Sequence, residues 1–154
     1  MLNLFNALVS LNATLAGKIR SIASYDEALA LYNNKDYVKA LPLMTEAAEL
    51  GNVHAMSLLG AMHLLGQGVR EDGLLAVVWL QRAMDGGYES AASLLGMALA
   101  TGKAGVKIDL PKARMLLKAA ASKGDAQSAR MLEMIDRGEG MFASLGKGRQ
   151  RNSR

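Results

Sequence analysis

The chain has 154 residues, and 51% of them are hydrophobic although only 5% are aromatic. That length is typical of one domain, and a composition rich in Ala, Leu, Gly and Met favours closely packed helices. The formal net charge of +4 resides in the C-terminal tail, whose four basic residues are Lys147, Arg149, Arg151 and Arg154. Because the rest of the chain is neutral and the tail has no aromatic residue for base stacking, this distribution argues against nucleic-acid binding. The absence of cysteine excludes disulfide bonds and thiolate metal sites.

One segment of the chain occurs twice. Residues 55–60 read AMSLLG, and residues 91–96, 36 positions later, read AASLLG. Glycine, valine, aspartate and alanine residues further along recur at a shift of 37, and the similarity extends over about residues 25–137. Internal repeats with a period of about 20 to 50 residues are typical of stacked units that bury their apolar surfaces against one another. The sequence therefore predicts a repeat architecture.

Each full repeat is predicted to contain two helices. An A helix is expected at 53–65 and again at 89–101, and a B helix at 73–85 and again at 110–123. Aspartate precedes both B helices at the N-cap position, and glycine follows the helices where a left-handed residue can end them. These residues are Asp72, Asp109, Gly66, Gly87, Gly102 and Gly124.

Two glycines, Gly60 and Gly96, lie inside the predicted A helices. Glycine there costs about 1 kcal/mol relative to alanine. We therefore expect a neighbouring helix to approach closely at both positions.

The first unit diverges from the other two. Helices are expected at 25–33 and 36–50, with Asp36 as the N-cap of the second. Pro42 conflicts with that helix, so the helix either begins near Lys39, with Pro42 in its first turn, or is kinked.

An amphipathic helix is predicted for residues 1–22. Its apolar stripe comprises Leu4, Phe5, Leu8, Leu11, Leu15, Ile19 and Ile22. Interspersed asparagines and the lack of preceding cations argue against a secretory signal or a membrane span, and a lipid-surface helix would carry more cations than Lys18 and Arg20. We expect this helix to cap the first repeat; the alternative is a membrane-peripheral role through the same residues.

The two full units resemble the Sel1-like repeat, a relative of the tetratricopeptide repeat. The first copy reads Ala55, Leu59, Gly60, Gly66, Gly68, Val69, Asp72, Ala76, Trp79, Ala83 and Gly87. The second copy reads Ala91, Leu95, Gly96, Gly102, Gly105, Val106, Asp109, Ala113, Leu116, Ala120 and Gly124. His63 and Leu99 stand where the family usually has tyrosine, and Leu116 replaces the tryptophan. The resemblance implies an all-α, right-handed α-solenoid and a non-catalytic protein–protein scaffold or adaptor, of bacterial type.

The predicted organisation has three parts. Residues 1–22 form the amphipathic capping helix, residues 23–140 the repeat domain and residues 141–154 a basic, disordered tail. Within the repeat domain we expect a divergent unit, two full units and a closing half-unit, at 25–51, 52–87, 88–124 and 125–137.

The chain has few residues capable of catalysis. Its two histidines, His54 and His63, lack the spacing of a helical metal site, and His63 occupies a core-type position. The loops Gly66-Gln-Gly68 and Gly102–Gly105 follow helices rather than strands, which argues against phosphate binding. We therefore expect no enzymatic activity, no cofactor, no metal and no small-molecule substrate. A cytoplasmic location is expected because no convincing signal peptide is present.

A partner peptide or helix is expected on the concave surface, which the resemblance implies is lined by A helices. Methionine suits such a surface because its flexible thioether adapts to different partners, whereas Met62 and Met131 are expected to fill the core. Small neighbouring residues would leave room for an incoming segment. The predicted contact residues are Met56, Ser57, Ala61, Ser93, Met97, Ala100 and Met134.

Overall fold

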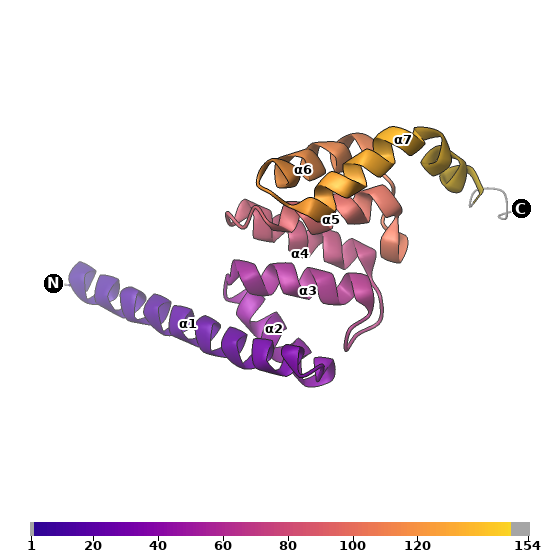
Figure 1. Ribbon diagram of the computed structural model, residues 1–154. Coiled ribbons are helices and arrows are strands. Elements are labelled where there is room, and N and C mark those ends of the chain that lie inside the picture. Colours follow the sequence, from indigo (N-terminus) through magenta and orange to yellow (C-terminus); the bar gives the residue numbers. More distant parts are fainter. Residues whose placement is uncertain (1, 149–154) are drawn as a thin grey trace, which may run out of the picture.

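The computed structural model describes residues 2–148, which form seven α-helices, one short 3-10 helix and no strand (Figure 1). This arrangement confirms the predicted all-α class. The helices are α1 (Leu2–Asn33), α2 (Tyr37–Glu49), α3 (Val53–Leu65), α4 (Gly73–Asp85), α5 (Ala91–Thr101), η1 (Lys103–Gly105), α6 (Leu110–Ser122) and α7 (Ala126–Gly148).

The helices of the two full units have the predicted limits to within about two residues, and α3 and α4 agree at both ends. Asp72 and Asp109 cap α4 and α6 by accepting hydrogen bonds from the backbone N–H groups of Leu75 (2.9 Å) and Lys112 (3.0 Å). The A helices α3 and α5 end at left-handed glycines, Gly66 (φ 66°) and Gly102 (φ 68°). Local capping chemistry therefore sets the helix ends.

Each A helix packs closely on the B helix of its own unit. A Cβ atom added at Gly60 would lie 2.7 Å from Leu80 Cγ, and one added at Gly96 would lie 2.8 Å from Leu117 Cγ. Both distances are too short for a real contact, so the predicted close approach is confirmed. The leucines that pack here are fully buried, and they continue into one core along the stack.

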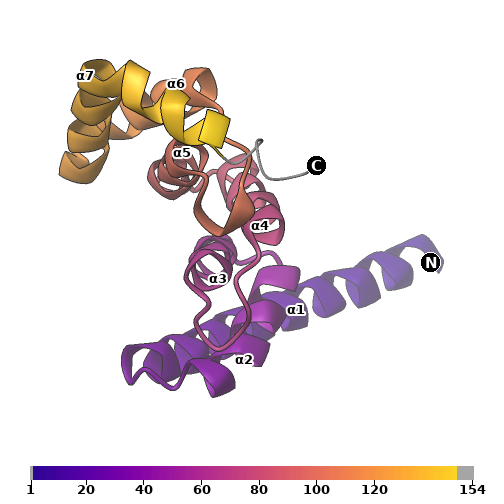
Figure 2. The same ribbon diagram turned by 90° about the vertical axis from the view of Figure 1, so that its right-hand side faces the viewer.

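The A helices lie on the inner side of the stack. Direct contacts connect α3 with α5 and α5 with α7, whereas the B helices α2, α4 and α6 contact mainly A helices. Figure 2 shows the stack rising from α1 and α2 at the bottom to α6 and α7 at the top. Because neighbouring units are closer on the A side, that side is the concave one.

The structure decides two details of the first unit, the place of Pro42 in its second helix and the capping of that helix. Helix α2 begins at Tyr37, so Pro42 lies inside it rather than in its first turn. Pro42 leaves the Val38 carbonyl without its usual helical donor, and both residues are on the exposed face, where water can replace that donor. Asp36 does not cap α2 with its side chain, because its carboxylate accepts a hydrogen bond from Lys39 Nζ at 2.7 Å.

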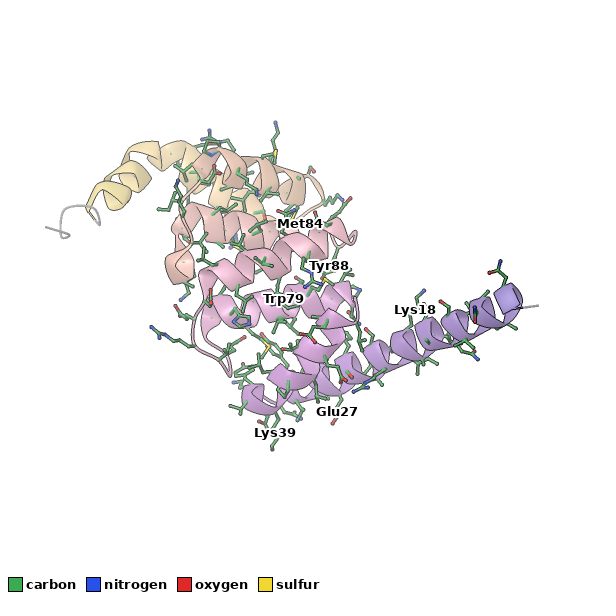
Figure 3. The ribbon with its side chains drawn as sticks, turned by 180° about the vertical axis from the view of Figure 1, so that it is seen from behind. Lys18, Glu27, Lys39, Trp79, Met84 and Tyr88 are labelled. Carbon is green, nitrogen blue, oxygen red and sulfur yellow. The ribbon has the colours of Figure 1, made fainter. Side chains whose placement is uncertain are left out.

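The N-terminal helix is longer than predicted and does not cap the stack with its apolar stripe. Helix α1 continues without interruption to Asn33, and its buried residues on the side of α2 are Ser21, Ser24 and Ala28. At 100° per residue, that face and the apolar stripe point about 150° apart. From Leu8 to Ile22 the stripe is exposed, and the first turns of α1 project from the stack (Figure 3).

The chain after the last repeat also departs from expectation. Helix α7 continues to Gly148, with non-helical dihedral angles at Gly138 (φ −128°, ψ 23°). The expected disorder from residue 141 is therefore wrong as far as 148, where the backbone is helical. The rest of the predicted tail, 149–154, lies outside the described residues.

Candidate functional site

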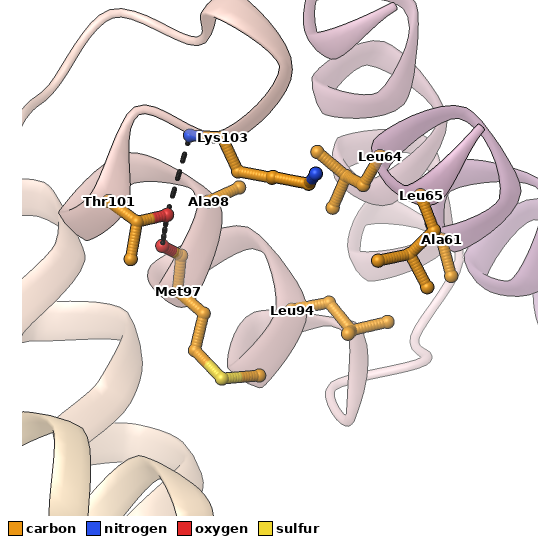
Figure 4. Close-up of a pocket in the computed structure, with 8 residues that line it drawn as sticks. All are labelled: Ala61, Leu64, Leu65, Leu94, Met97, Ala98, Thr101 and Lys103. Atoms are coloured by element: carbon orange, nitrogen blue, oxygen red, sulfur yellow. Dashed lines mark hydrogen bonds between the residues drawn. The ribbon is translucent and has the colours of Figure 1, made fainter. Parts of the chain in front are cut away.

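A small pocket opens between the consecutive A helices α3 and α5 (Figure 4). Its volume is ≈ 160 Å³. Helix α3 contributes three residues, α5 four and η1 one: Ala61, Leu64, Leu65, Leu94, Met97, Ala98, Thr101 and Lys103.

The pocket exists because small residues face it from both helices. Ala61 on α3 and Ala98 on α5 fill less space than the leucines around them, while Leu64 and Leu94 form apolar walls. Met97 is half-buried, and its flexible thioether can adapt to whatever enters. These small residues therefore leave a gap between two A helices that touch each other at few points.

Polar groups at the rim are already paired. Thr101 donates its hydroxyl hydrogen bond to the Met97 carbonyl at 2.8 Å. Lys103 Nζ lies 2.8 Å from Glu71 Oε1, which links the loop after α3 to the loop after α5. Both charged side chains are 45% exposed, so this ion pair contributes at most about 1 kcal/mol and can exchange with a partner's charge. The wall itself offers only apolar contact.

Size and chemistry together restrict what the pocket can hold. Small-molecule and cofactor sites usually enclose about 300 to 1,000 Å³ and contain converging polar groups. This pocket is smaller and apolar, and it resembles in volume an engineered cavity of about 150 Å³ that binds benzene. It fits one large apolar side chain of another molecule.

The structure separates the seven predicted contact residues into two groups. Ala61 and Met97 line the pocket, and Met134 lies on α7 with 53% of its surface exposed, one repeat after Met97. The prediction of a free surface is wrong for the other four, which are buried between helices: Met56, Ser57, Ser93 and Ala100. Ala61 is buried as well, with 8% of its surface exposed, and contributes only to the pocket wall. Met62 is fully buried, as expected of a core methionine, and Met131 is half-buried.

Ser93 shows why small polar residues of the A helices are not free. Its hydroxyl oxygen accepts a hydrogen bond from the Ser128 hydroxyl at 2.9 Å, across the α5–α7 junction. The Asp125 carboxylate accepts hydrogen bonds from the backbone N–H groups of Ser128 and Gln127. The bond from the Ser128 N–H has the largest effect in holding the pKa of Asp125 below its usual value, and a hydrogen bond from the Ser93 hydroxyl has the next largest. Ser93 therefore joins two repeats and stabilises the cap of α7.

The two histidines lie in different surroundings. His63 is buried, and its Nδ1 has no hydrogen-bond partner among the described residues. Burial lowers the pKa of its imidazole, although the negative charge of Asp72 acts in the opposite direction. His54 is exposed, with its ring centroid 4.6 Å from that of Tyr88. No group of three or more metal-ligating residues occurs within residues 2–148.

Sequence reasoning missed most of the pocket. Leu64, Leu65, Leu94, Ala98, Thr101 and Lys103 were not singled out, although Ala61, Leu65 and Leu94 stand in register with Met97, Thr101 and Leu58 at a shift of 36. Following that register along the A helices, rather than choosing methionines, would have found the lining.

Two-helix units stacked in register, with a pocket between successive A helices, define a helical-repeat solenoid, a class that binds along extended surfaces. The Sel1 repeat model matches residues 34–52, 53–88 and 89–125. The chain therefore belongs to the Sel1 repeat family, as its sequence indicated. Proteins of this family are generally non-catalytic scaffolds for protein–protein interaction.

Solved structures of bacterial proteins share the fold. A Sel1 repeat protein from Oxalobacter formigenes is 28% identical, with a TM-score of 0.64 over 75% of this chain. The c5321 protein, described as a protective antigen of uropathogenic Escherichia coli with an SLR fold, is 28% identical, with a TM-score of 0.63 over 70% of this chain. This chain spans only 48% of the first protein and 24% of the second.

A third likeness concerns the fold alone. Helicobacter pylori cysteine rich protein B is 19% identical, with a TM-score of 0.58, and the match covers 82% of this chain and 95% of that protein. The present chain contains no cysteine. No curated protein sequence matches this chain.

Within the described residues, none of the helices has the length and hydropathy that crossing a membrane requires.

Proposed function

We propose that this chain is a non-catalytic adaptor of a bacterial cell, which holds a peptide or helix of a partner protein along the concave A-helix surface. The partner inserts one large apolar side chain into the pocket between α3 and α5. The observation that carries the proposal is the pocket itself, because it is apolar, open and sized for one side chain.

The surroundings of the pocket support a macromolecular partner. Leu65 at its lip is 55% exposed, and Met134 extends an apolar surface to the next unit. An isolated leucine on a surface is unremarkable, but apolar residues beside a preformed cavity can act as anchors in an interface. Lys103 and Glu71 at the rim would supply orientation rather than most of the affinity.

Affinity capture with matched surface variants tests this proposal. The double variant Leu65→Glu with Met97→Glu places charge at the pocket, whereas Leu74→Glu with Met115→Glu places the same charge on the outer B helices α4 and α6. Leu74 and Met115 are 74% and 63% exposed, so the control replaces side chains that are more exposed than those of the pocket variant. We expect proteins captured from an extract of the native host to be lost by the pocket variant and retained by the control.

Two further measurements decide the interpretation. Thermal melting must show both double variants folded, because loss of capture by an unfolded chain says nothing about the pocket. The recovered partner, added to protein labelled at its methionine methyl groups, should shift the Met97 signal and leave the Met115 signal in place. Capture by the pocket variant at wild-type level would refute the concave-face mechanism.

A further inference from the structure

The projecting part of α1 carries an apolar stripe that no described residue covers. Five large aliphatic side chains lie along it, each with more than half of its surface exposed: Leu8 (54%), Leu11 (63%), Leu15 (54%), Ile19 (60%) and Ile22 (58%). Helices in proteins are stabilised mostly by packing of an apolar face, and short isolated helices are marginal in water. Another molecule packed on this stripe would therefore stabilise the helix.

The spacing of the stripe is the same when read from either end. Leu15 is at the centre, with Leu11 and Ile19 four residues away on either side and Leu8 and Ile22 seven residues away. When a second α1 is placed antiparallel about Leu15, Leu11 lies opposite Ile19 of the other copy and Leu8 lies opposite its Ile22. We propose that two copies of this chain associate through antiparallel pairing of their α1 helices, centred on Leu15.

Charge favours this pairing over its alternatives. Lys18 would lie opposite Asn12 of the other copy, so like charges do not face each other, whereas a parallel pairing would place Lys18 against Lys18. Arg20 is already paired with Glu46 of α2. Without a cationic polar face, the stripe lacks what a helix lying on a lipid surface normally carries.

The repeat stack leaves room for a second copy. The face of α1 that packs on α2, with Ser21, Ser24 and Ala28, points about 150° away from the stripe. An antiparallel partner would also carry its own stack at the opposite end of the helix pair. Each dimer would then present two concave surfaces, and a C2 pairing of identical surfaces closes without forming filaments.

Sedimentation velocity of the full chain across a concentration series tests the association. Leu15→Glu would bury two facing charges, so we expect it to raise the dimer dissociation constant at least about tenfold. Val9→Glu is the matched control because Val9 is 53% exposed on the same helix but about 120° from Leu15. We expect Val9→Glu to leave the dissociation constant unchanged, and circular dichroism should show both variants helical.

Single cysteines test the register independently, because the chain has no cysteine of its own. In the proposed dimer the two copies of Leu15→Cys face each other, whereas the two copies of Leu8→Cys lie about 21 Å apart along the axis. A disulfide needs Cα atoms within about 7 Å. Mild oxidation should therefore give a covalent dimer of Leu15→Cys and little of Leu8→Cys.

Four results would overturn the proposal: a monomer throughout the concentration series, a dimer that Leu15→Glu leaves intact, equal cross-linking at positions 8 and 15, or a monomer that binds vesicles of phosphatidylcholine and phosphatidylglycerol through α1. The last result would assign the stripe to a lipid surface. A concentration-dependent dimer, weakened by Leu15→Glu and cross-linked at position 15, would support it.

Discussion

Helices α5 and α1 both contain strongly apolar segments, but their environments differ. In α5, Leu95 is fully buried and Gly96 lies against Leu117 of the next helix. In the first part of α1, Leu15 is 54% exposed and Gly17 has no atom within 4 Å of an added Cβ. The comparison teaches that an amphipathic pattern predicts a helix, whereas a repeated pattern also predicts the neighbour on which it packs.

The reason is that the sequence specifies the packing partners of the two regions in different ways. Within the repeats, the same positions recur every 36 or 37 residues, so each unit presents a surface that fits the next one. Residues 1–22 lie outside that register. Their apolar stripe can be recognised, but the repeat register does not specify which surface it meets.

The largest expected effect comes from a charge introduced in each region. Leu95→Glu buries a carboxylate in the core and should cost more than about 4 kcal/mol of stability, enough to unfold a marginal domain. Val9→Glu should change the free energy of unfolding by less than about 0.5 kcal/mol. Urea unfolding followed by circular dichroism measures both, and similar losses would show that α1 is part of the core.

Truncation tests where the supporting part of α1 begins. Removing residues 1–17 should leave the repeat stack within about 0.5 kcal/mol of its original stability, since residues 6–16 are all exposed. Removing residues 1–33 uncovers the face of α2 that contains Ala40 and Met44 and should cost roughly 3 kcal/mol or more, with aggregation. Thermal melting at low protein concentration is the measurement. A large loss from the shorter truncation would restore the capping role.

Two glycine-to-alanine changes, one in each region, should change stability in opposite directions. Gly96→Ala forces a Cβ atom to 2.8 Å from Leu117 Cγ, so we expect a net loss of about 1 to 3 kcal/mol. Gly17→Ala meets no obstacle and should gain up to about 1 kcal/mol of helix stability. Chemical unfolding of the stack reports the first change, and the helical signal of α1 reports the second. A stabilising Gly96→Ala would mean that the two helices can separate at little cost.

The smallest expected effect is a dependence of stability on pH. Burial lowers the pKa of His63 from its ordinary value of 6.5, so the folded state binds a proton less readily than the unfolded state. The contribution to stability is complete above pH 6.5 and decreases as the pH falls from there towards the lowered pKa. His63→Gln should remove this loss, and His54→Gln is the control. Chemical unfolding at a series of pH values measures this dependence. If the free energy of unfolding of His63→Gln fell with pH as steeply as that of the wild type, the dependence would originate in another group.

Much of the fold could be predicted because it depends on local and repeated signals. Asp72, Asp109, Gly66 and Gly102 mark helix ends through their own chemistry, and the spacing of Gly60 and Gly96 revealed the close helix contacts. The pocket was harder to predict. Ala61 and Met97 were recognised, but Ser93 forms a buried hydrogen bond across a helix junction, and Met56 fills the core. Neither fact follows from helical spacing, since both depend on which neighbouring side chain fills the remaining space.

The sequence by itself determined the repeat, its helices and its family, because capping residues act within a few positions and the 36-to-37-residue register identifies the stacking partners. Only the tertiary structure decided which inward residues stay accessible, where the gap beside Ala61 and Ala98 lies, and that the stripe of α1 points away from α2. These properties depend on the relative rotation and separation of whole helices. Such distances are set by packing among side chains far apart in the chain, and small changes in side-chain volume are enough to open or close a pocket.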